Sequence, residues 1–284
     1  LWLVLARAWW KHRLAWTKVK RITTALGLLM LAGVPWMLFI ATSPATYPPI
    51  DRTTGGPTGA SLLGSTLSVV ALLLILPASL GLKRAKSPRR WLWWVFVAEF
   101  VTFIALEAKG GSHFTLLQII GLGLLLPWLW WIPSEWKRFD WPERSIFWKR
   151  SMLVWWGVLV IAGWLEFLPG VLDRMKFTNG LVAHAHLAMA GFTSSFGLLL
   201  LTLLGGEKTS LSLSRGGWLW NSAVGLHVLV LMICGWLEGG SNSWIDGHTL
   251  WRETAFFIRL LCGLVMLGVA AFWWRGSFSN SDDS

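Results

Sequence analysis

Charge is scarce in this chain. Only 14% of its 284 residues are Asp, Glu, Lys or Arg, which is too few for the surface of an ordinary soluble domain. Cysteine is rarer still, since Cys234 and Cys262 are the only two. They fall in different apolar segments at different depths, which excludes a disulfide and a cysteine metal clip. The apolar segments are joined too tightly for a soluble domain, so we expect one helical bundle.

Hydrophobic residues make up 55% of the chain, and several apolar runs exceed the roughly 18 residues that mark a membrane-spanning helix. Because lipid leaves no backbone group unpaired, these spans must be helices. We therefore expect an all-α, polytopic membrane helix bundle. About eight spans are predicted, over residues 22 to 43, 59 to 83, 91 to 108, 113 to 132, 151 to 168, 179 to 204, 217 to 238 and 250 to 274.

The net charge of +11 follows the predicted topology and does not indicate a nucleic-acid partner. Nineteen of the 25 Lys and Arg residues fall on the side that holds the N-terminus. The opposite side holds five, which are Arg52, Lys109, Arg174, Lys176 and Arg252. By the positive-inside rule both termini lie in the cytoplasm, as in a multi-pass protein of the bacterial inner membrane.

The two ends of the chain differ from its apolar centre. Residues 1 to 21 mix basic and aromatic side chains and predict an interfacial segment, without the pattern of a signal peptide. Residues 277 to 284 predict a disordered tail. Tryptophans near predicted span ends are interpreted as interfacial anchors, namely Trp91, Trp93, Trp94, Trp128, Trp130, Trp131, Trp155, Trp156, Trp273 and Trp274.

The most informative segment places His184 and His186 two residues apart in an apolar stretch. In an α-helix this spacing turns a side chain by roughly 200°, so the two imidazoles point to opposite flanks. A single tetrahedral metal site is therefore a poor interpretation, and two separate partners are expected. Two hypotheses stay open: each ring binds a cofactor, or each hydrogen-bonds to a neighbouring helix as structural glue.

The predicted topology places His113, His184, His186 and His248 near the external face, with His227 deeper in the seventh span. Imidazoles from different helices in one half of the membrane are typical of a b-type haem site. The haem propionates would need cations, for which Arg252 and Arg259 are the candidates. Arg259 lies inside a span, where an unpaired guanidinium costs at least roughly 2.5 kcal/mol. Glu253, Glu99 and a cofactor carboxylate are its possible partners.

Three further acids, Glu107, Glu166 and Glu238, lie close to external span ends. We expect water to reach them there, so their charge needs no functional explanation.

The segment Val182-Ala183-His184-Ala185-His186-Leu187 resembles the tenth helix of subunit I of haem-copper oxidases. Downstream, Gly235-Trp236-Leu237-Glu238-Gly239 and Thr254-Ala255-Phe256-Phe257-Ile258-Arg259 are similar to the last helices of the nitric oxide reductase and high-affinity oxidase branches. The resemblance covers about residues 165 to 275. It implies that His184 binds a high-spin haem iron and His186 a low-spin one.

The same resemblance excludes a complete oxygen reductase. That family has twelve core helices, an adjacent pair of copper histidines, a haem ligand on its second helix and a catalytic tyrosine. Here no adjacent histidine pair exists, 59 to 82 holds no histidine, and Tyr47 is the only tyrosine. No copper site is therefore expected.

Three functions are left open. The protein could be an electron-transfer subunit with haem b, opposed to His184 or His186 by His113, His227 or His248. It could be a cofactor-free scaffold in a larger redox complex, or a transporter. On the first two hypotheses, other respiratory subunits are expected partners, with a cytochrome or quinol as possible electron donor.

Overall fold

The computed structural model describes residues 59–109, 115–176, 178–204, 213–240 and 249–278. It also describes residues 6, 7, 9, 10, 13, 14, 16–18, 21, 22, 24, 25, 28, 29, 32 and 33. The chain divides into two units, residues 1–54 and 55–284, each treated by itself. Every regular element among the described residues is a helix, which confirms the predicted all-α class.

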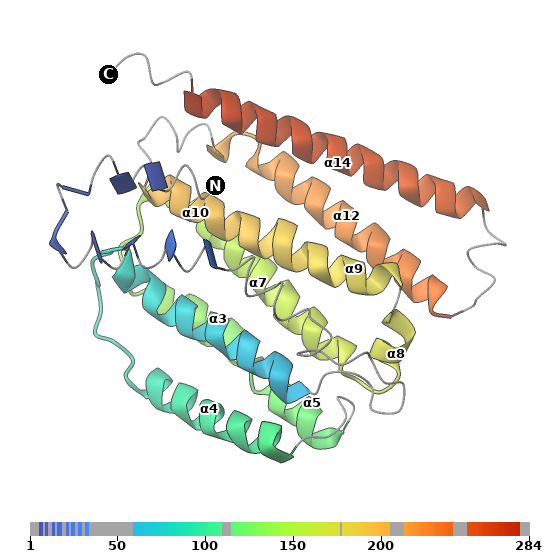
Figure 1. The fold of residues 1–284 in the computed structure, drawn as a ribbon, viewed down its shortest axis with the longest axis horizontal. Helices are drawn as coiled ribbons and strands as arrows, with labels where there is room; N and C mark the ends of the chain where they lie inside the picture. Colours follow the sequence, from blue (N-terminus) through green and yellow to red (C-terminus); the bar gives the residue numbers. More distant parts are fainter. Residues whose placement is uncertain are drawn as a thin grey trace. The chain divides into compact units, whose positions relative to one another are not determined.

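The second unit holds the described helices α3 to α14, with their labels as in Figure 1. Their bounds are α3 Gly59–Ser79, α4 Trp91–Lys109, α5 Leu116–Gly123, α6 Trp128–Trp136, the 3₁₀ turn η1 Glu143–Ser145, α7 Ile146–Glu166, α8 Val171–Met175, α9 Asn179–His186, the π-helical η2 Leu187–Thr193, α10 Ser194–Leu204, α12 Gly217–Glu238 and α14 Thr249–Phe278. The long helices run in alternating directions, as tightly connected spans require (Figure 1).

Among the described residues, five helical segments are long and apolar enough to cross a membrane. They are Leu116–Trp136, Glu143–Glu166, Asn179–Leu204, Gly217–Glu238 and Leu250–Arg275. Each overlaps a predicted span, although Glu143–Glu166 begins eight positions before the span predicted over 151 to 168. The spans predicted over 59 to 83 and 91 to 108 correspond to α3 and α4, whose described apolar parts are shorter. The span predicted over 22 to 43 lies mostly outside the described residues.

Tryptophan forms much of the core, which corrects part of the anchor prediction. Of the predicted anchors, Trp128, Trp156 and Trp273 are buried, and Trp136 and Trp148 are buried with them. Trp136 Nε1 donates to the Leu73 carbonyl at 2.8 Å, and so joins α6 to α3. Buried indoles supply a large packing area, and the Trp128 indole likewise donates to Glu99 of α4. Trp91, Trp93, Trp94, Trp130 and Trp274 are exposed, as the anchor interpretation expects.

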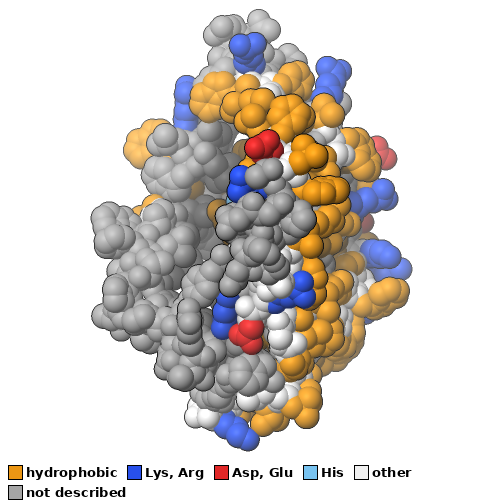
Figure 2. All heavy atoms as spheres, turned by 90° about the vertical axis from the view of Figure 1, so that its right-hand side faces the viewer, with side chains coloured by type: hydrophobic (Ala, Val, Ile, Leu, Met, Phe, Trp, Pro, Cys, Tyr) orange, Lys and Arg blue, Asp and Glu red, His pale blue; other side chains and the backbone are white. Residues whose placement is uncertain are grey.

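Many other apolar side chains are also exposed, especially on α14. Figure 2, which views the end of the molecule at the right of Figure 1, shows hydrophobic side chains as a continuous band over its described part, with charged side chains scattered beside it. An exposed apolar surface of this extent is typical of helices in contact with lipid or with another apolar partner.

Two glycines let α9 and η2, which continues α9 along the chain, pack closely against α12 and α7. A Cβ on Gly235 of α12 would overlap the Gly180 backbone, so α9 and α12 pack with their main chains in contact. A Cβ on Gly191 would lie 2.8 Å from the Trp155 ring of α7. These contacts hold the histidine-bearing segment between α7 and α12, directly against the α12 main chain and against the Trp155 ring of α7.

The first unit is described in part. Trp9 Nε1 donates to the Arg21 carbonyl at 3.2 Å, and the Arg13 guanidinium lies 3.2 Å from the centroid of the Trp10 ring. Such contacts between basic and aromatic side chains are consistent with the expected interfacial character of residues 1 to 21.

Candidate functional site

Helix α9 places its two histidines on opposite flanks, as the rotation argument predicts. The His184 ring lies against α7, where Nδ1 is 3.2 Å from Glu166 Oε1. The His186 ring lies against α12, with its centroid 4.9 Å from that of His227. The two imidazoles therefore have separate partners, and a shared metal ion between them is excluded by their directions.

The His184 flank is closely packed. A Cβ on Gly163 of α7 would lie 3.3 Å from His184 Cε1, so the ring packs closely against the α7 backbone there. The Glu166 side chain is 7% exposed, which overturns the expectation that water reaches it. Glu166 is the last residue of α7. The turn of α8 reverses the chain, so that α9 runs back along α7 and covers Glu166 (Figure 1).

The His186 flank contains a second imidazole. His186 Nδ1 lies 2.9 Å from the Val182 carbonyl oxygen. A carbonyl only accepts, so Nδ1 carries the hydrogen, and Nε2 of the neutral ring keeps its lone pair. Histidines that bind metals commonly have this arrangement, in which a carbonyl fixes the tautomer and orients the ring.

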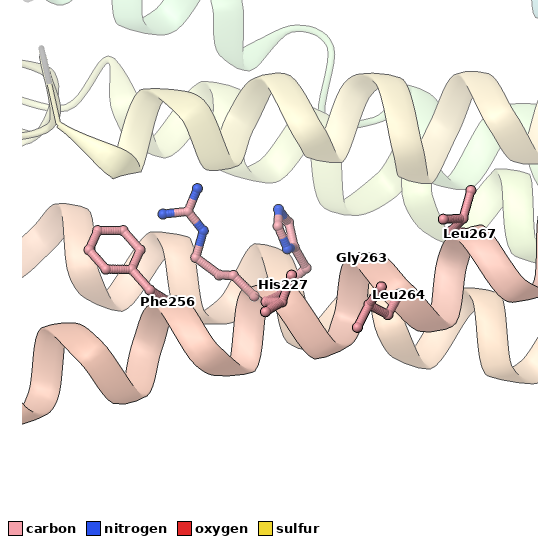
Figure 3. A pocket seen from close by; sticks show the side chains of 7 residues that line it. His227, Phe256, Gly263, Leu264 and Leu267 are labelled. Atoms are coloured by element: carbon pink, nitrogen blue, oxygen red, sulfur yellow. The ribbon is translucent and has the colours of Figure 1, made fainter.

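His227 of α12 is 9% exposed, and neither of its ring nitrogens has a close hydrogen bond to a described residue; the Arg259 backbone is its weak partner. It lines a groove of about 430 Å³ that α14 completes. Figure 3 shows His227, Phe256, Gly263, Leu264 and Leu267 along this groove, and Arg259 and Leu260 complete its lining. At Gly263 no described atom lies within 4 Å of where a Cβ would be, so the groove is open there.

Arg259 is the cation of this groove. Its Nη1 donates to Asn179 Oδ1 at 3.2 Å, and its guanidinium lies 5.3 Å from the centroid of the Phe256 ring. No carboxylate among the described residues lies within 4 Å of it. The predicted pair with Glu99 is wrong, because Glu99 instead accepts a 2.6 Å hydrogen bond from Trp128 Nε1.

Asn179 links this cation to an acid that the sequence prediction left without a role. The Asn179 backbone N–H donates to Glu238 Oε2 at 2.8 Å, and its side-chain amide donates to Glu238 Oε1. The first turn of α9 is thereby tied to the last turn of α12. Asn179 and Glu238 were missed as a pair because they lie 59 positions apart and no sequence period connects them.

The remaining predicted site residues are placed less fully. His113 and His248 lie outside the described residues, so their prediction as ligands stays a prediction. Arg252 is half-buried in the first turn of α14. Within the described ranges, no three side chains of His, Cys, Asp or Glu form a group that could hold a metal ion. Cys234 and Cys262 are both free and buried, as expected.

Taken together, the His186 flank offers two imidazoles, one guanidinium without a counter-ion among the described residues, and an apolar wall. This combination suits a ligand with a large apolar body, an atom that binds imidazole and an anionic group. No known protein-family model matches the chain, and no curated protein matches it.

Proposed function

We propose that this protein is an integral membrane subunit of a respiratory electron-transfer complex and that it binds a b-type haem in the groove beside His227. The observation that carries the proposal is the His227 ring, which is buried, lines the groove and, among the described residues, has a weak hydrogen bond to the Arg259 backbone. Because a buried polar group left unsatisfied costs about 1–3 kcal/mol, a ligand at this weakly bonded ring would stabilise the site.

The other groove residues fit a haem as well. Arg259 would pair with a propionate, which would neutralise a guanidinium inside an apolar helix. Phe256 and the leucines of α14 would contact the macrocycle, and a groove of about 430 Å³ is within the usual size for a cofactor. A bound haem would supply reversible one-electron transfer, and this chain would supply the ligand, the cation and the apolar surroundings.

The spacing of the two rings decides which histidine we assign to the iron. Two imidazoles that bind one iron from opposite sides need ring centres roughly 6 Å apart, because each metal–nitrogen bond is about 2 Å long. His186 and His227 lie 4.9 Å apart, so no haem fits between them as they stand. We assign the ligand to His227, which lines the groove, and to His186 the ring contact that orients it.

The membrane arrangement belongs to the same proposal. We infer eight spans with both termini in the cytoplasm of a bacterial inner membrane, from the apolar runs and the distribution of Lys and Arg. The resemblance of residues 165 to 275 to haem-copper oxidase subunit I supports a respiratory role. Since this chain lacks most ligands of an oxidase centre, we expect partner subunits and a cytochrome or quinol donor.

A cofactor-free scaffold subunit is the second candidate. The contact between the His186 and His227 rings and the bond from Arg259 to Asn179 favour it, because they join three helices without any cofactor. On this alternative the same residues stabilise the bundle and bind no iron.

Three alanine variants separate the two candidates. His227→Ala should abolish the Soret band of the purified protein, and His186→Ala should shift or weaken it. His184→Ala is the matched control and should keep the band, since His184 faces the opposite flank against Glu166. A colourless wild-type protein, or equal loss in all three variants, would overturn the haem assignment.

A further inference from the structure

The connection between α3 and α4 carries basic side chains that the proposed function does not use. Together with the residues after α6 they form a cluster, here called the basic corner, of Lys83, Arg84, Lys86, Arg89, Arg90, Lys137 and Arg138. Backbone hydrogen bonds hold its two segments together. The Ala85 N–H donates to the Arg138 carbonyl at 2.7 Å, and the Asp140 N–H donates to the Lys83 carbonyl at 2.9 Å.

A buried carboxylate organises the centre of the basic corner. Glu135 Oε1 lies 2.7 Å from Arg84 Nη1, and Glu135 Oε2 lies 3.6 Å from Arg138 Nε. Arg89 Nη1 donates to the neutral Ser134 hydroxyl at 2.5 Å. One carboxylate thus serves two guanidinium groups, while a third has a partner without charge. These contacts fix the shape of the corner but leave most of its positive charge unneutralised.

Four members of the corner project outward. Lys83, Lys86, Arg90 and Lys137 are exposed, and none has a carboxylate of a described residue within 4 Å. Asp140 is the other acid of the two segments. The corner therefore presents a rigid, strongly positive surface to its surroundings, which favours an anionic partner.

The neighbouring side chains identify the kind of anion. Helix α4 begins directly after Arg90 with Trp91, Trp93 and Trp94, all of them exposed. The Trp91 ring packs edge-on against Trp131 with centroids 5.2 Å apart, which holds this turn against α6. Exposed indoles beside lysine and arginine are typical of the lipid headgroup level of a membrane, whereas a dissolved anion would need charge alone.

We propose that the basic corner binds the phosphate headgroup of an anionic membrane lipid, such as cardiolipin or phosphatidylglycerol. Lys83, Lys86, Arg90 and Lys137 contact the phosphate oxygens, and the exposed indoles lie along the acyl–headgroup boundary. Glu135 keeps Arg84 and Arg138 in place beneath them. The corner is formed by the connection between α3 and α4 and by the residues after α6, so the inference does not depend on haem at His227.

The test uses the full chain in detergent and measures bound lipid by native mass spectrometry. Cardiolipin, phosphatidylcholine and inorganic phosphate are added separately. Two quadruple variants remove equal charge, and all eight substituted side chains are exposed. The corner variant is Lys83→Gln, Lys86→Gln, Arg90→Gln and Lys137→Gln. The control variant is Arg144→Gln, Arg150→Gln, Arg215→Gln and Arg275→Gln.

The wild type and the control variant should retain cardiolipin in preference to phosphatidylcholine. The corner variant should bind cardiolipin at least about tenfold more weakly than the wild type does. Equal loss of cardiolipin binding in both quadruple variants would show that binding depends on net positive charge and not on the basic corner, and would overturn the proposal. Phosphate that binds as tightly as cardiolipin would overturn the choice of a lipid. If the corner variant does not fold by circular dichroism, the double variant Lys86→Gln and Arg90→Gln is measured under the same criteria.

Discussion

His184 and His186 lie in the same turn of α9, yet their surroundings share nothing. His184 contacts a buried carboxyl group, whereas His186 contacts a second imidazole next to an open groove. The difference follows from helix rotation alone, because two positions turn a side chain by roughly 200°. At the scale of residues, this pair therefore combines a structural contact with a candidate cofactor site.

The contact of His184 with Glu166 should be measurable as a coupling energy. Glu166→Ala leaves the imidazole without this partner and should lower the free energy of unfolding by about 1–3 kcal/mol. His184→Ala should have a similar effect, and the double variant should be no worse than the more damaging single one. Thermal unfolding in detergent measures the cycle. Fully additive losses would show that the two side chains do not interact.

Part of this arrangement of residues could be predicted from the sequence. The directions of His184 and His186 could be predicted, because they depend only on helix geometry. The burial of Glu166 could not be predicted, because it depends on how α8 returns the chain onto α7. Likewise Trp128 and Trp156 resemble interfacial anchors by position, and only the packing of neighbouring helices places them inside.

At the scale of elements, the site depends on how closely α9 approaches α12. Gly235 and Gly180 let the two backbones touch, and Asn179 ties the same helices together through Glu238. The chain then continues as the π-helical η2, where the Trp220 indole donates to the Ala190 carbonyl at 3.3 Å. π-Helical segments often accompany functional sites. No periodicity in the sequence predicts this π-helical segment, which the Trp155 and Trp220 side chains contact from the neighbouring helices.

Gly235→Ala tests the close approach of α9 and α12. The added methyl group would overlap the Gly180 backbone and should lower the free energy of unfolding by about 3 kcal/mol. Gly268→Ala in α14 is the matched control, since no described atom lies within 4 Å of its Cβ position. It should leave stability unchanged or raise it by up to about 1 kcal/mol. Denaturation followed by circular dichroism measures both, and a tolerated Gly235→Ala would contradict the packing.

At the scale of the whole molecule, the alternating helices of the second unit separate two groups of connections. The segment from Lys83 to Arg90 lies at one end, and the turn of α8 lies at the other (Figure 1). In the proposed topology, which rests on the distribution of Lys and Arg, the first end faces the cytoplasm. The apolar runs predicted this alternation well, because hydropathy alone defines the spans, whereas the contacts between spans require the folded chain.

Cysteine labelling tests the proposed orientation. In a background with Cys234→Ala and Cys262→Ala, single cysteines replace the exposed residues Lys86 and Asp173. A thiol reagent that does not cross membranes should label Asp173→Cys in intact cells, and Lys86→Cys only after the membrane is opened. The reverse pattern would invert the topology, and labelling of both positions in intact cells would place them on the same side.

The central claim is that the groove beside His227 binds haem. A pyridine-haemochrome assay on the full chain, purified from cells supplied with haem precursor, tests it most directly. We predict about one b-type haem per chain, with the amount reduced by His227→Ala and kept by His184→Ala. A wild-type protein that folds, inserts into the membrane and yields no haemochrome would contradict the account.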